Sequence, residues 1–345
     1  MSESLDTRRI MVTGGAGFIG SHLVKKLLNE GHSVLNVDSL TYAGNLSSLA
    51  GFVDHPEYRF LQVDVCEEGK ITQAISHFQP DWIFHLAAET HVDRSIGGPM
   101  EFFRSNVTGT VSLLRGATSY WESLSDAKKA GFRFIHTSTD EVFGSAHVGC
   151  RFNETSAYAP GSPYSASKAA SDHAVRAWGN TYGLPVAVTN CSNNYGSFQF
   201  PEKLIPVVIT NALRGNPIPV YGQGLQVRDW LHVYDHCQAL VLIAQKGKIG
   251  DTYIIAGNDE WRNIDVVELV CGILEKRMGS RPEIEFVADR KGHDFRYSLD
   301  SSKIRNELGW SPLRSSKDGF EETVAWYFEN RNWWESILMK NSGKV

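Results

Sequence analysis

Residues 9–20 read Arg9-Ile-Met-Val-Thr-Gly-Gly-Ala-Gly-Phe-Ile-Gly20, an apolar run that leads directly into a glycine-rich turn. A helical pattern follows at residues 21–30, so this order predicts a β-strand, a turn and an α-helix. Gly14 permits the tight turn, Gly17 lets a pyrophosphate approach the backbone, and Gly20 allows the helix to pack closely on the strand. Free N–H groups at a helix N-terminus bind phosphate readily. The stretch therefore predicts a dinucleotide-binding unit.

The next predicted strand, residues 33–38, ends in an acid. Asp38 lies at about the spacing at which such units hold the ribose hydroxyls of the cofactor. A carboxylate here would repel a 2′-phosphate, and residues 39–45 contain no arginine that could bind one. The sequence therefore favours NAD over NADP as the cofactor.

Strand and helix patterns continue to alternate, with strands expected at residues 58–64 and 81–88 and a helix at residues 71–78. This alternation predicts an α/β fold with a doubly wound parallel sheet of the Rossmann type. Ligands bind such sheets in a crevice at the carboxyl ends of the strands. The residues that we expect to contact NAD are Gly14, Gly17, Phe18, Ile19, Gly20, Asp38, Asp64, Val65, Leu86, Ala87, Ala88, Ser105, Tyr164, Lys168 and Asn194.

The chemistry should lie in residues 134–144, Phe134-Ile-His-Thr-Ser-Thr-Asp-Glu-Val-Phe-Gly144. An apolar strand pattern there gives way to three hydroxyl residues, ending in Thr139, and then to two adjacent acids, Asp140 and Glu141. We expect a buried strand whose polar end opens on the ligand crevice. Taken alone, the two acids are equally consistent with an ordinary polar turn, so their meaning depends on what lies around them.

A second candidate pair follows in a helix that Pro163 begins. Tyr164 and Lys168 are four residues apart and share one helical face. Chance supplies roughly one such spacing in a chain of this composition, so the pair is informative only because it follows the glycine turn and five strands. A lysine ammonium and a cationic nicotinamide would both favour the phenolate of a tyrosine, whose usual pKa is about 10. We therefore expect Tyr164 to act as a base.

The alternation breaks after a sixth strand at residues 186–190, and proline and glycine become frequent through residues 215–230. A smaller substrate domain should begin there. The expected division is a Rossmann domain of residues 1–192 plus about 231–258, and a substrate-binding α/β domain of about 193–230 plus 259–345. Further helices are expected near residues 233–245, 264–277, 301–308 and 320–330, followed by an aromatic tail at residues 332–338. The candidate anion-binding residues are Lys203, Arg228, Arg290 and Lys291, although each alone is more commonly a solvated surface charge.

One long helix is expected from Pro99 to about Ser123, with too many apolar positions for one narrow stripe. Such a helix packs on two sides, so we expect a homodimer, with burial within one chain as the alternative.

The 345-residue chain is 42% hydrophobic and 21% charged, which is typical of a globular protein. Its net charge of −5 argues against a general nucleic-acid surface. The five cysteines form no CxxC pair, which favours reduced thiols over disulfides or a metal site. The N-terminal residues lack an apolar signal segment, and no segment is apolar enough to span a bilayer. We therefore expect a cytoplasmic protein without a metal, a membrane or a nucleic-acid partner.

Segments distributed over essentially the whole chain share a pattern with one family. They are Leu40-Thr-Tyr-Ala-Gly-Asn45, His85-Leu-Ala-Ala-Glu-Thr-His-Val-Asp-Arg-Ser-Ile96, Ser138-Thr-Asp-Glu-Val142, Tyr164-Ser-Ala-Ser-Lys168, Thr189-Asn-Cys-Ser-Asn-Asn-Tyr-Gly196, Pro201-Glu-Lys-Leu-Ile-Pro206, Val227-Arg-Asp-Trp230 and Gly292-His-Asp294. Together they resemble the dTDP-glucose 4,6-dehydratases, which are extended short-chain dehydrogenases/reductases. The acid pair is the specific part, because C4-epimerases and decarboxylases of the same fold share the tyrosine and lysine but typically lack it.

The resemblance implies a mechanism and a set of roles. NAD+ would take hydride from the sugar C4 while Tyr164 takes the hydroxyl proton, with Thr139 hydrogen-bonded to that oxygen. Glu141 would then remove the C5 proton and Asp140 would protonate the departing C6 hydroxyl, and hydride would return to C6. Two adjacent carboxyls in a desolvated pocket can separate their pKa values in this way, but the sequence leaves open which acid is protonated.

The resemblance also implies a substrate site, with Arg228 facing the diphosphate of a nucleotide-sugar. The expected substrate-binding residues are Thr90, Thr139, Asn193, Lys203, Leu204, Pro219, Tyr221, Arg228, Asn263, Arg290 and His293. Ser197-Phe198 replaces a Pro-Tyr pair of the family and Lys291 replaces a proline, so the base and sugar are less well defined than the reaction. The alternatives are a dehydratase of another nucleotide-sugar, an epimerase or decarboxylase, and a non-enzymatic regulator on the same fold.

Overall fold

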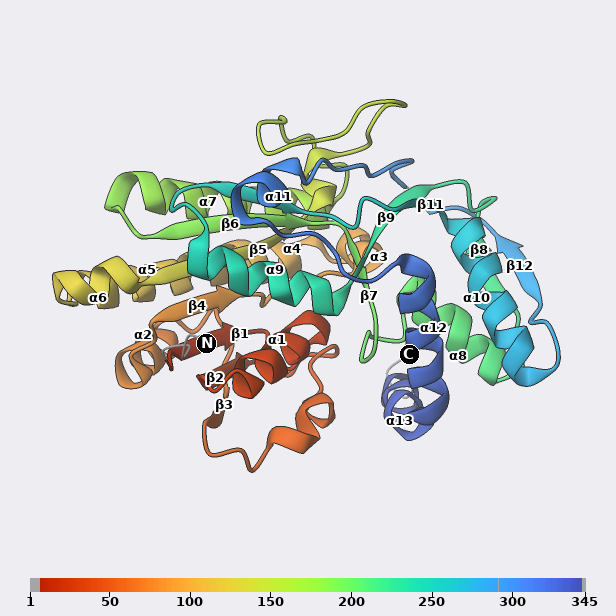
Figure 1. Cartoon of the computed structure of the whole chain (residues 1–345), viewed down its shortest axis with the longest axis horizontal. Helices are drawn as coiled ribbons and strands as arrows, with labels where there is room; N and C mark the ends of the chain where they lie inside the picture. The colour runs from red at the N-terminus through yellow and green to blue at the C-terminus, as the bar shows by residue number, and fades with distance from the viewer. Residues whose placement is uncertain (1–6, 291, 343–345) are drawn as a thin grey trace.

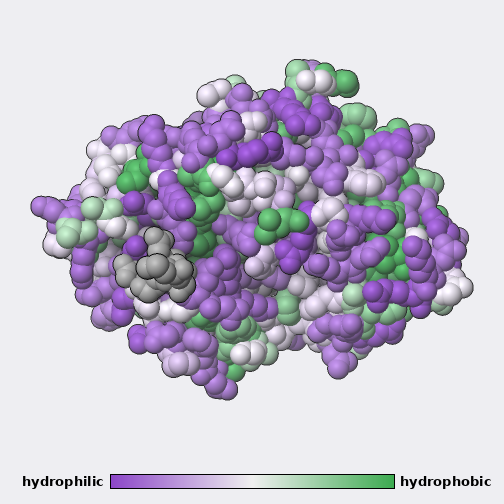
Figure 2. All heavy atoms as spheres, viewed as in Figure 1, coloured by the Kyte–Doolittle hydropathy of each residue, from purple (hydrophilic) through white to green (hydrophobic). Residues whose placement is uncertain are grey.

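The computed structural model describes residues 7–290 and 292–342, so Lys291, one of the expected anion-binding residues, lies outside it. A large sheet with helices on both faces lies beside a smaller group of helices and strands (Figure 1). Among the described residues, no helix is long and apolar enough to cross a membrane. The face shown in Figure 2 is mainly hydrophilic, with small hydrophobic groups between the polar ones.

The large sheet has seven parallel strands in the order β10-β6-β5-β4-β1-β2-β3. This confirms the predicted doubly wound parallel sheet. The strands are β1 (Arg9–Thr13), β2 (Ser33–Asp38), β3 (Tyr58–Gln62), β4 (Trp82–His85), β5 (Arg133–Thr139), β6 (Val186–Cys191) and β10 (Thr252–Ile255). The order reverses direction between β1 and β4, and open α/β sheets bind ligands at that point.

Two apolar cores cover the two faces of this sheet. One core joins the sheet to α1 (Phe18–Asn29), α9 (Val233–Lys246) and α11 (Ser302–Leu308). The other joins it to α2 (Glu68–Phe78), α5 (Gly109–Glu122) and α7 (Pro163–Tyr182). A strand buried on both faces must be apolar almost throughout, which explains the near-continuous apolar runs in the sequence.

The ends of α7 show why the sequence forms a helix there. Ser162 and Ser165 form a reciprocal capping box, and Pro163 occupies the first turn, where its missing N–H costs no hydrogen bond. At the other end Gly183 has a φ of 73°, a left-handed conformation that glycine adopts at low cost. The helix that carries Tyr164 and Lys168 is therefore fixed at both ends by local sequence.

The expected helical stretch from Pro99 to about Ser123 is present, and its middle is π-helical. The structure has α4 (Pro99–Phe102), a π-helical segment η2 (Phe103–Thr108) and then α5. Asn106 in η2 is buried, and its amide donates to the Glu89 carbonyl at 3.0 Å and to the Ser167 hydroxyl at 2.8 Å. The wider π turn lets this polar side chain point inward, and π-bulges often lie at functional sites.

The smaller part contains a three-stranded sheet ordered β11-β9-β7 and a two-stranded sheet ordered β12-β8. Its own apolar core includes Trp230, Phe320 and Trp334. The elements of this part are β7 (Asn193–Tyr195), α8 (Leu204–Leu213), β8 (Ile218–Tyr221), β9 (Val227–His232), β11 (Glu260–Arg262), α10 (Asn263–Met278), β12 (Ile284–Val287), α12 (Ser316–Glu329) and α13 (Arg331–Ser342). Short segments complete the fold: η1 (Leu46–Phe52), α3 (Val92–Gly97), α6 (Asp126–Gly131) and η3 (Asp140–Phe143).

Candidate active site

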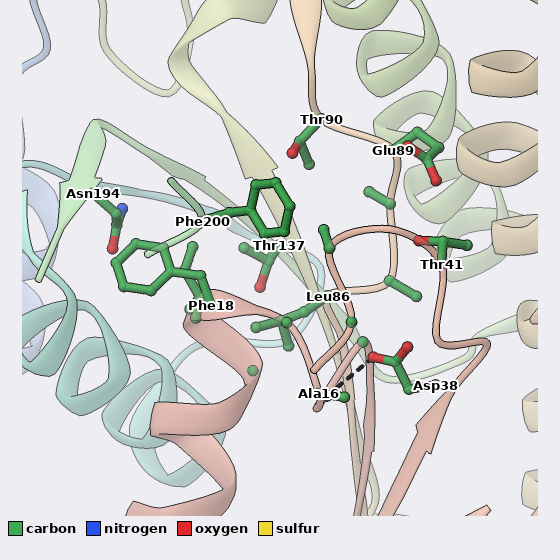
Figure 3. Close-up of a pocket in the computed structure, with 18 of the residues that line it drawn as sticks. Ala16, Phe18, Asp38, Thr41, Leu86, Glu89, Thr90, Thr137, Asn194 and Phe200 are labelled. Atoms are coloured by element: carbon green, nitrogen blue, oxygen red, sulfur yellow. Dashed lines mark hydrogen bonds between the residues drawn. The ribbon is translucent and has the colours of Figure 1, made fainter. Parts of the chain in front are cut away.

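A pocket of about 310 Å³ opens at the carboxyl ends of β1, β2, β4 and β5. Every residue that we expected to contact NAD lines it. Figure 3 labels Phe18 at the start of α1 and Phe200, ahead of α8, among the residues that line the pocket. The structure also refines the sequence reading, because β3 ends at Gln62 and β4 at His85. Asp64, Val65 and residues 86–88 therefore line the pocket from the loops after these strands.

The glycine turn has the geometry that the sequence predicted. Gly14 has a φ of 71°, and a Cβ built on it would lie 2.7 Å from the main-chain nitrogen of Ala87. A Cβ on Gly20 would lie 2.7 Å from the Gly15 Cα and closer still to the Gly14 carbonyl oxygen. Side chains at Gly14 and Gly20 would therefore collide with backbone, which cannot move aside cheaply.

Asp38 ends β2 at the opposite end of the pocket from the acid pair, and Figure 3 shows its hydrogen bond to Ala16. One carboxylate oxygen accepts the N–H of Ala16 at 3.0 Å and the other accepts the N–H of Leu40 at 2.8 Å. Burial raises the pKa of Asp38, and the two N–H donors oppose that rise. The carboxylate is therefore held in a fixed orientation at the position expected for a ribose.

Unpaired polar atoms in the pocket fit a bound dinucleotide. Within the described part of the chain, Thr137 Oγ1 and Asn193 Oδ1 are buried, lie in the pocket lining and have no hydrogen-bond partner. Buried polar atoms are normally paired, so these atoms need a partner from a ligand or from water. Together with the glycine turn and Asp38, they make the pocket suitable for NAD.

The acid pair stands directly after β5. Thr139 ends the strand, and its hydroxyl donates to Asp140 Oδ1 at 3.2 Å. The Thr139 hydroxyl oxygen also accepts the N–H of Glu141 at 3.3 Å. The 3₁₀ turn η3 then begins with the two acids. Thr139, Asp140 and Glu141 all line the pocket, so the predicted triplet faces one ligand space.

The surroundings raise the pKa values of the two carboxyls to different extents. Burial, followed by the charge of Glu141, raises the pKa of Asp140 well above its usual value. Burial also raises the pKa of Glu141, but the cations Arg228 and Lys203 oppose that rise. Asp140 is consequently the better proton holder and Glu141 the better carboxylate, which answers the question that the sequence left open.

Tyr164 and Lys168 lie beside this pair and are almost completely buried. The Lys168 ammonium donates to the Thr137 carbonyl at 2.9 Å. The expected fall in the pKa of Tyr164 is wrong for the chain alone. Burial, with the charge of Glu141, raises that pKa well above its usual value. Thr139 hydrogen-bonds to Tyr164 and opposes this rise, and Lys168 shares the helix face of Tyr164. Bringing the pKa of Tyr164 down toward neutral pH therefore requires the positive charge of a ligand.

The expected substrate residues divide into two groups. Thr90, Thr139, Asn193 and Lys203 line the pocket, and the Lys203 ammonium donates to the Thr90 carbonyl at 3.2 Å. The residues outside the pocket lining are Leu204, Pro219, Tyr221, Arg228, Asn263, Arg290 and His293. Leu204 and Asn263 begin α8 and α10, and Pro219 lies in β8.

Three of the outer residues form a cluster at the edge of the smaller part. The Arg290 guanidinium lies 5.0 Å from the centre of the Tyr221 ring, and the His293 ring lies 6.5 Å from the same ring. His293 Nδ1 lies 2.7 Å from a carboxylate oxygen of Asp289. Arg228 is buried, and its positive charge opposes the rise in the pKa of both Asp140 and Glu141. The charge of Arg290 also opposes the rise in the pKa of Glu141.

Sequence reasoning missed several residues that close over the pocket. The Tyr42 hydroxyl donates to Glu202 at 3.0 Å, and the Tyr42 ring packs edge-on against Phe200 at 5.3 Å. The Arg94 guanidinium lies 3.6 Å from the centre of the Tyr42 ring. Trp333 of α13 also lines the pocket. Tyr42 and Glu202 lie within segments that carried the family resemblance, but nothing local in either segment indicated that they meet.

The comparisons with known proteins agree with this geometry. The model of a family described as GDP-mannose 4,6 dehydratase matches residues 11–323. A dTDP-glucose 4,6-dehydratase of Neisseria meningitidis serogroup B is 51% identical over 341 residues, which cover 96% of each chain. One from Shigella flexneri is 52% identical over 343 residues and 95% of each chain.

Solved structures give the same result. A dTDP-glucose 4,6-dehydratase of Streptomyces venezuelae, with NAD and TYD bound, has a TM-score of 0.87 and 46% identity. The match covers 95% of this chain and 99% of that one. A UDP-glucose 4-epimerase of Thermotoga maritima, with UDP-glucose, has a TM-score of 0.84 but only 28% identity, over 93% and 99% of the chains. Backbone similarity alone therefore does not separate the two reactions.

Proposed function

Because this chain belongs to the dTDP-glucose 4,6-dehydratase family of extended short-chain dehydrogenases/reductases, we propose that it dehydrates dTDP-glucose to dTDP-4-keto-6-deoxyglucose with NAD as cofactor. The observation that carries the proposal is the acid pair. Asp140 and Glu141 face one pocket together with Tyr164, and the environment favours the proton on Asp140. An epimerase needs the tyrosine but not an acid and a base for elimination.

The first step is oxidation at C4. NAD+, when bound, would accept hydride from C4 of the sugar and return it to C6 after the elimination, and Glu141 would then return a proton to C5. Tyr164 takes the proton of the 4-hydroxyl, and Thr139 hydrogen-bonds to the same oxygen. Lys168 lies on the same helix face as Tyr164 and stabilises negative charge on the phenol oxygen.

The second step is elimination of water. The C4 ketone acidifies the C5–H bond, and Glu141, whose carboxylate is favoured by Arg228 and Lys203, removes that proton. Asp140 gives its proton to the departing C6 hydroxyl, so that water leaves and a C5–C6 double bond forms. Asp140 is buried, whereas Glu141 is partly exposed where it lines the pocket, so the proton that Glu141 takes can exchange with water before C5 is protonated again.

Mass spectrometry of dTDP-glucose treated with the purified protein in H2O and in D2O tests the reaction. We expect the loss of one water and the retention of one deuterium at C5. An epimerase would leave the mass unchanged. Loss of water only from a UDP-, GDP- or CDP-sugar would keep the mechanism and move the specificity to residues 197–204 and 289–293.

The Glu141→Gln variant tests the division of roles. The amide cannot remove the C5 proton, so elimination should stop while NADH still forms by C4 oxidation. Asp140→Asn is the matched control, because it removes the acid and keeps the base. Full turnover by Glu141→Gln would exclude Glu141 as the base.

We further propose that the protein is a homodimer that contacts its partner through the segment before α5. Met100 and Phe103, which are 77% and 38% exposed, place two large apolar side chains on the surface of α4 and η2. Sedimentation showing only a monomer would contradict this. The division into a Rossmann domain and a nucleotide-sugar-binding domain, at the boundaries given above, and a cytoplasmic location also stay proposals.

A further inference from the structure

Helix α7, which carries Lys168, places a second charged side chain one turn later on the same face. Asp172 is completely buried. Its Oδ2 accepts hydrogen bonds from the Tyr158 hydroxyl at 2.8 Å and from the Asn190 amide at 3.3 Å. His136 Nε2 lies 3.2 Å from its Oδ1. A buried carboxylate with several polar contacts has a fixed position.

One of these contacts connects Asp172 to the candidate active site. The Asn190 amide also donates to the carbonyl of Thr139, the last residue of β5 before the acid pair, at 3.1 Å. The Lys168 ammonium, one helical turn before Asp172, donates to the carbonyl of Thr137 on the same strand at 2.9 Å. Asp172 and Lys168 thus both lie beside the end of β5.

The charges around Lys168 leave Asp172 as its counterion. Burial lowers the pKa of Lys168, and Asp172, followed by the thiol of Cys191, raises it. His136 cannot neutralise Asp172, because burial and the charge of Lys168 lower the pKa of His136 to about 4. His85 is also neutral, since burial and the neighbouring cations lower its pKa well below the usual value.

Asp172 itself remains ionised. Burial alone would raise its pKa, but the hydrogen bond and charge of His136, followed by the charge of Lys168 and a hydrogen bond from Ser138, reverse that effect. The other cation of the cluster, Arg176, donates to the Tyr158 hydroxyl at 2.7 Å, and that hydroxyl donates to Asp172. Because His136 is neutral near neutral pH, Lys168, one helical turn away on α7, is the cation whose charge acts on Asp172.

We propose that Asp172 is a positioning residue for the reaction, which holds Lys168 as a charged ammonium beside Tyr164 by supplying a fixed, buried negative charge. The inference rests on the proposed function, because it concerns the oxidation step. Lys168 has three donor hydrogens and its contact to Thr137 uses one, so two remain for the tyrosine and the cofactor ribose. Without Asp172, the buried ammonium would lose its proton more easily, and Tyr164 would lose a neighbouring positive charge.

The experiment compares Glu141→Gln with Glu141→Gln/Asp172→Asn. In the Glu141→Gln background the reaction stops after C4 oxidation, so the NADH formed in a single turnover reports on Lys168 and Tyr164 without the acid step. A buried counter-charge shifts a pKa by about 1–3 units. We therefore expect the alkaline limb of the NADH formation rate to move down by about one pH unit or more in the double variant. At a pH below this limb, the two rates should agree.

Two further measurements separate this effect from misfolding. Tyr158→Phe removes a hydrogen bond to Asp172 but keeps its charge, so it should lower the thermal stability without moving the limb. The affinity for NADH can be measured by NADH fluorescence without any sugar. We expect this affinity to fall as the pH rises, and to begin falling at a lower pH in the Asp172→Asn variant than in the wild type. The inference would be overturned if Asp172→Asn changed neither the pH at which the NADH formation rate falls nor the pH dependence of NADH binding. If Glu141→Gln forms no NADH at all, the proposed function fails instead, and the NADH-binding profile still tests Asp172.

Discussion

Replacing Gly20 and Gly17 separately by alanine should separate the packing role of one glycine from the binding role of the other. A Cβ at Gly20 would lie 2.7 Å from the Gly15 Cα and 2.8 Å from the Gly14 carbonyl carbon. Both are main-chain atoms, so either the turn or the helix must shift. Overpacking of this kind costs about 1–3 kcal/mol, which lowers the melting temperature by roughly 2–12 °C.

Gly17 has a different environment. Its φ of −78° and ψ of −177° are open to any residue, and the nearest atom to a built Cβ is the Gly14 carbonyl oxygen at 3.2 Å. The protein alone should tolerate Gly17→Ala, because a loss of about 0.4–1 kcal/mol of unfolded-state entropy offsets the tight contact. The added methyl group does, however, occupy the face over which a pyrophosphate would pass, so NAD should bind roughly tenfold more weakly, about 1.4 kcal/mol.

Thermal unfolding without cofactor and calorimetric titration with NAD measure the two effects separately. Gly20→Ala should unfold at a lower temperature before any NAD is added. Gly17→Ala should unfold near the wild-type temperature but gain less from saturating NAD. An unchanged melting temperature in Gly20→Ala would refute the argument from backbone contact. Wild-type NAD affinity in Gly17→Ala would show that the pyrophosphate does not pass over this residue.

Three further outcomes follow from the structure. The rate of water loss should be bell-shaped in pH, because Glu141 must be ionised and Asp140 protonated. Since the pKa of each acid is raised, both limbs of the profile should lie at higher pH than those of ordinary carboxyls. A rate that is flat across this range would contradict the assignment. Trp334→Ala should lower the free energy of unfolding, measured by urea titration, by about 3–5 kcal/mol. The Trp334 indole is fully buried and donates to a main-chain carbonyl. A loss of less than about 1 kcal/mol would mean that α13 adds little to the core. Tyr42→Phe removes the hydrogen bond to Glu202, which is worth about 1 kcal/mol. Stopped-flow fluorescence should therefore show NADH dissociating roughly fivefold faster. An unchanged dissociation rate would mean that this contact does not retain the cofactor.

The sequence by itself determined the dinucleotide-binding half of the molecule. A parallel strand covered on both faces must be apolar along its length, and a glycine turn at the start of a helix has few alternatives, so both are visible locally. The expected β1 and β2 coincide with the observed strands, and α7 begins at the predicted proline. The acid pair was likewise found from its place after a strand.

Only the tertiary structure decided how distant residues act on one another. The raised pKa of Asp140 depends on burial and on the charge of Glu141, and the carboxylate of Glu141 is favoured by Arg228, which lies far along the chain in β9. The raised pKa of Tyr164 and the contact between Tyr42 and Glu202 arise in the same way. Desolvation and charge interactions fall off with distance in space rather than in sequence, so no local pattern records them. The π-helical segment within the expected long helix has the same origin, because the partners of the buried Asn106 amide come from elsewhere in the chain.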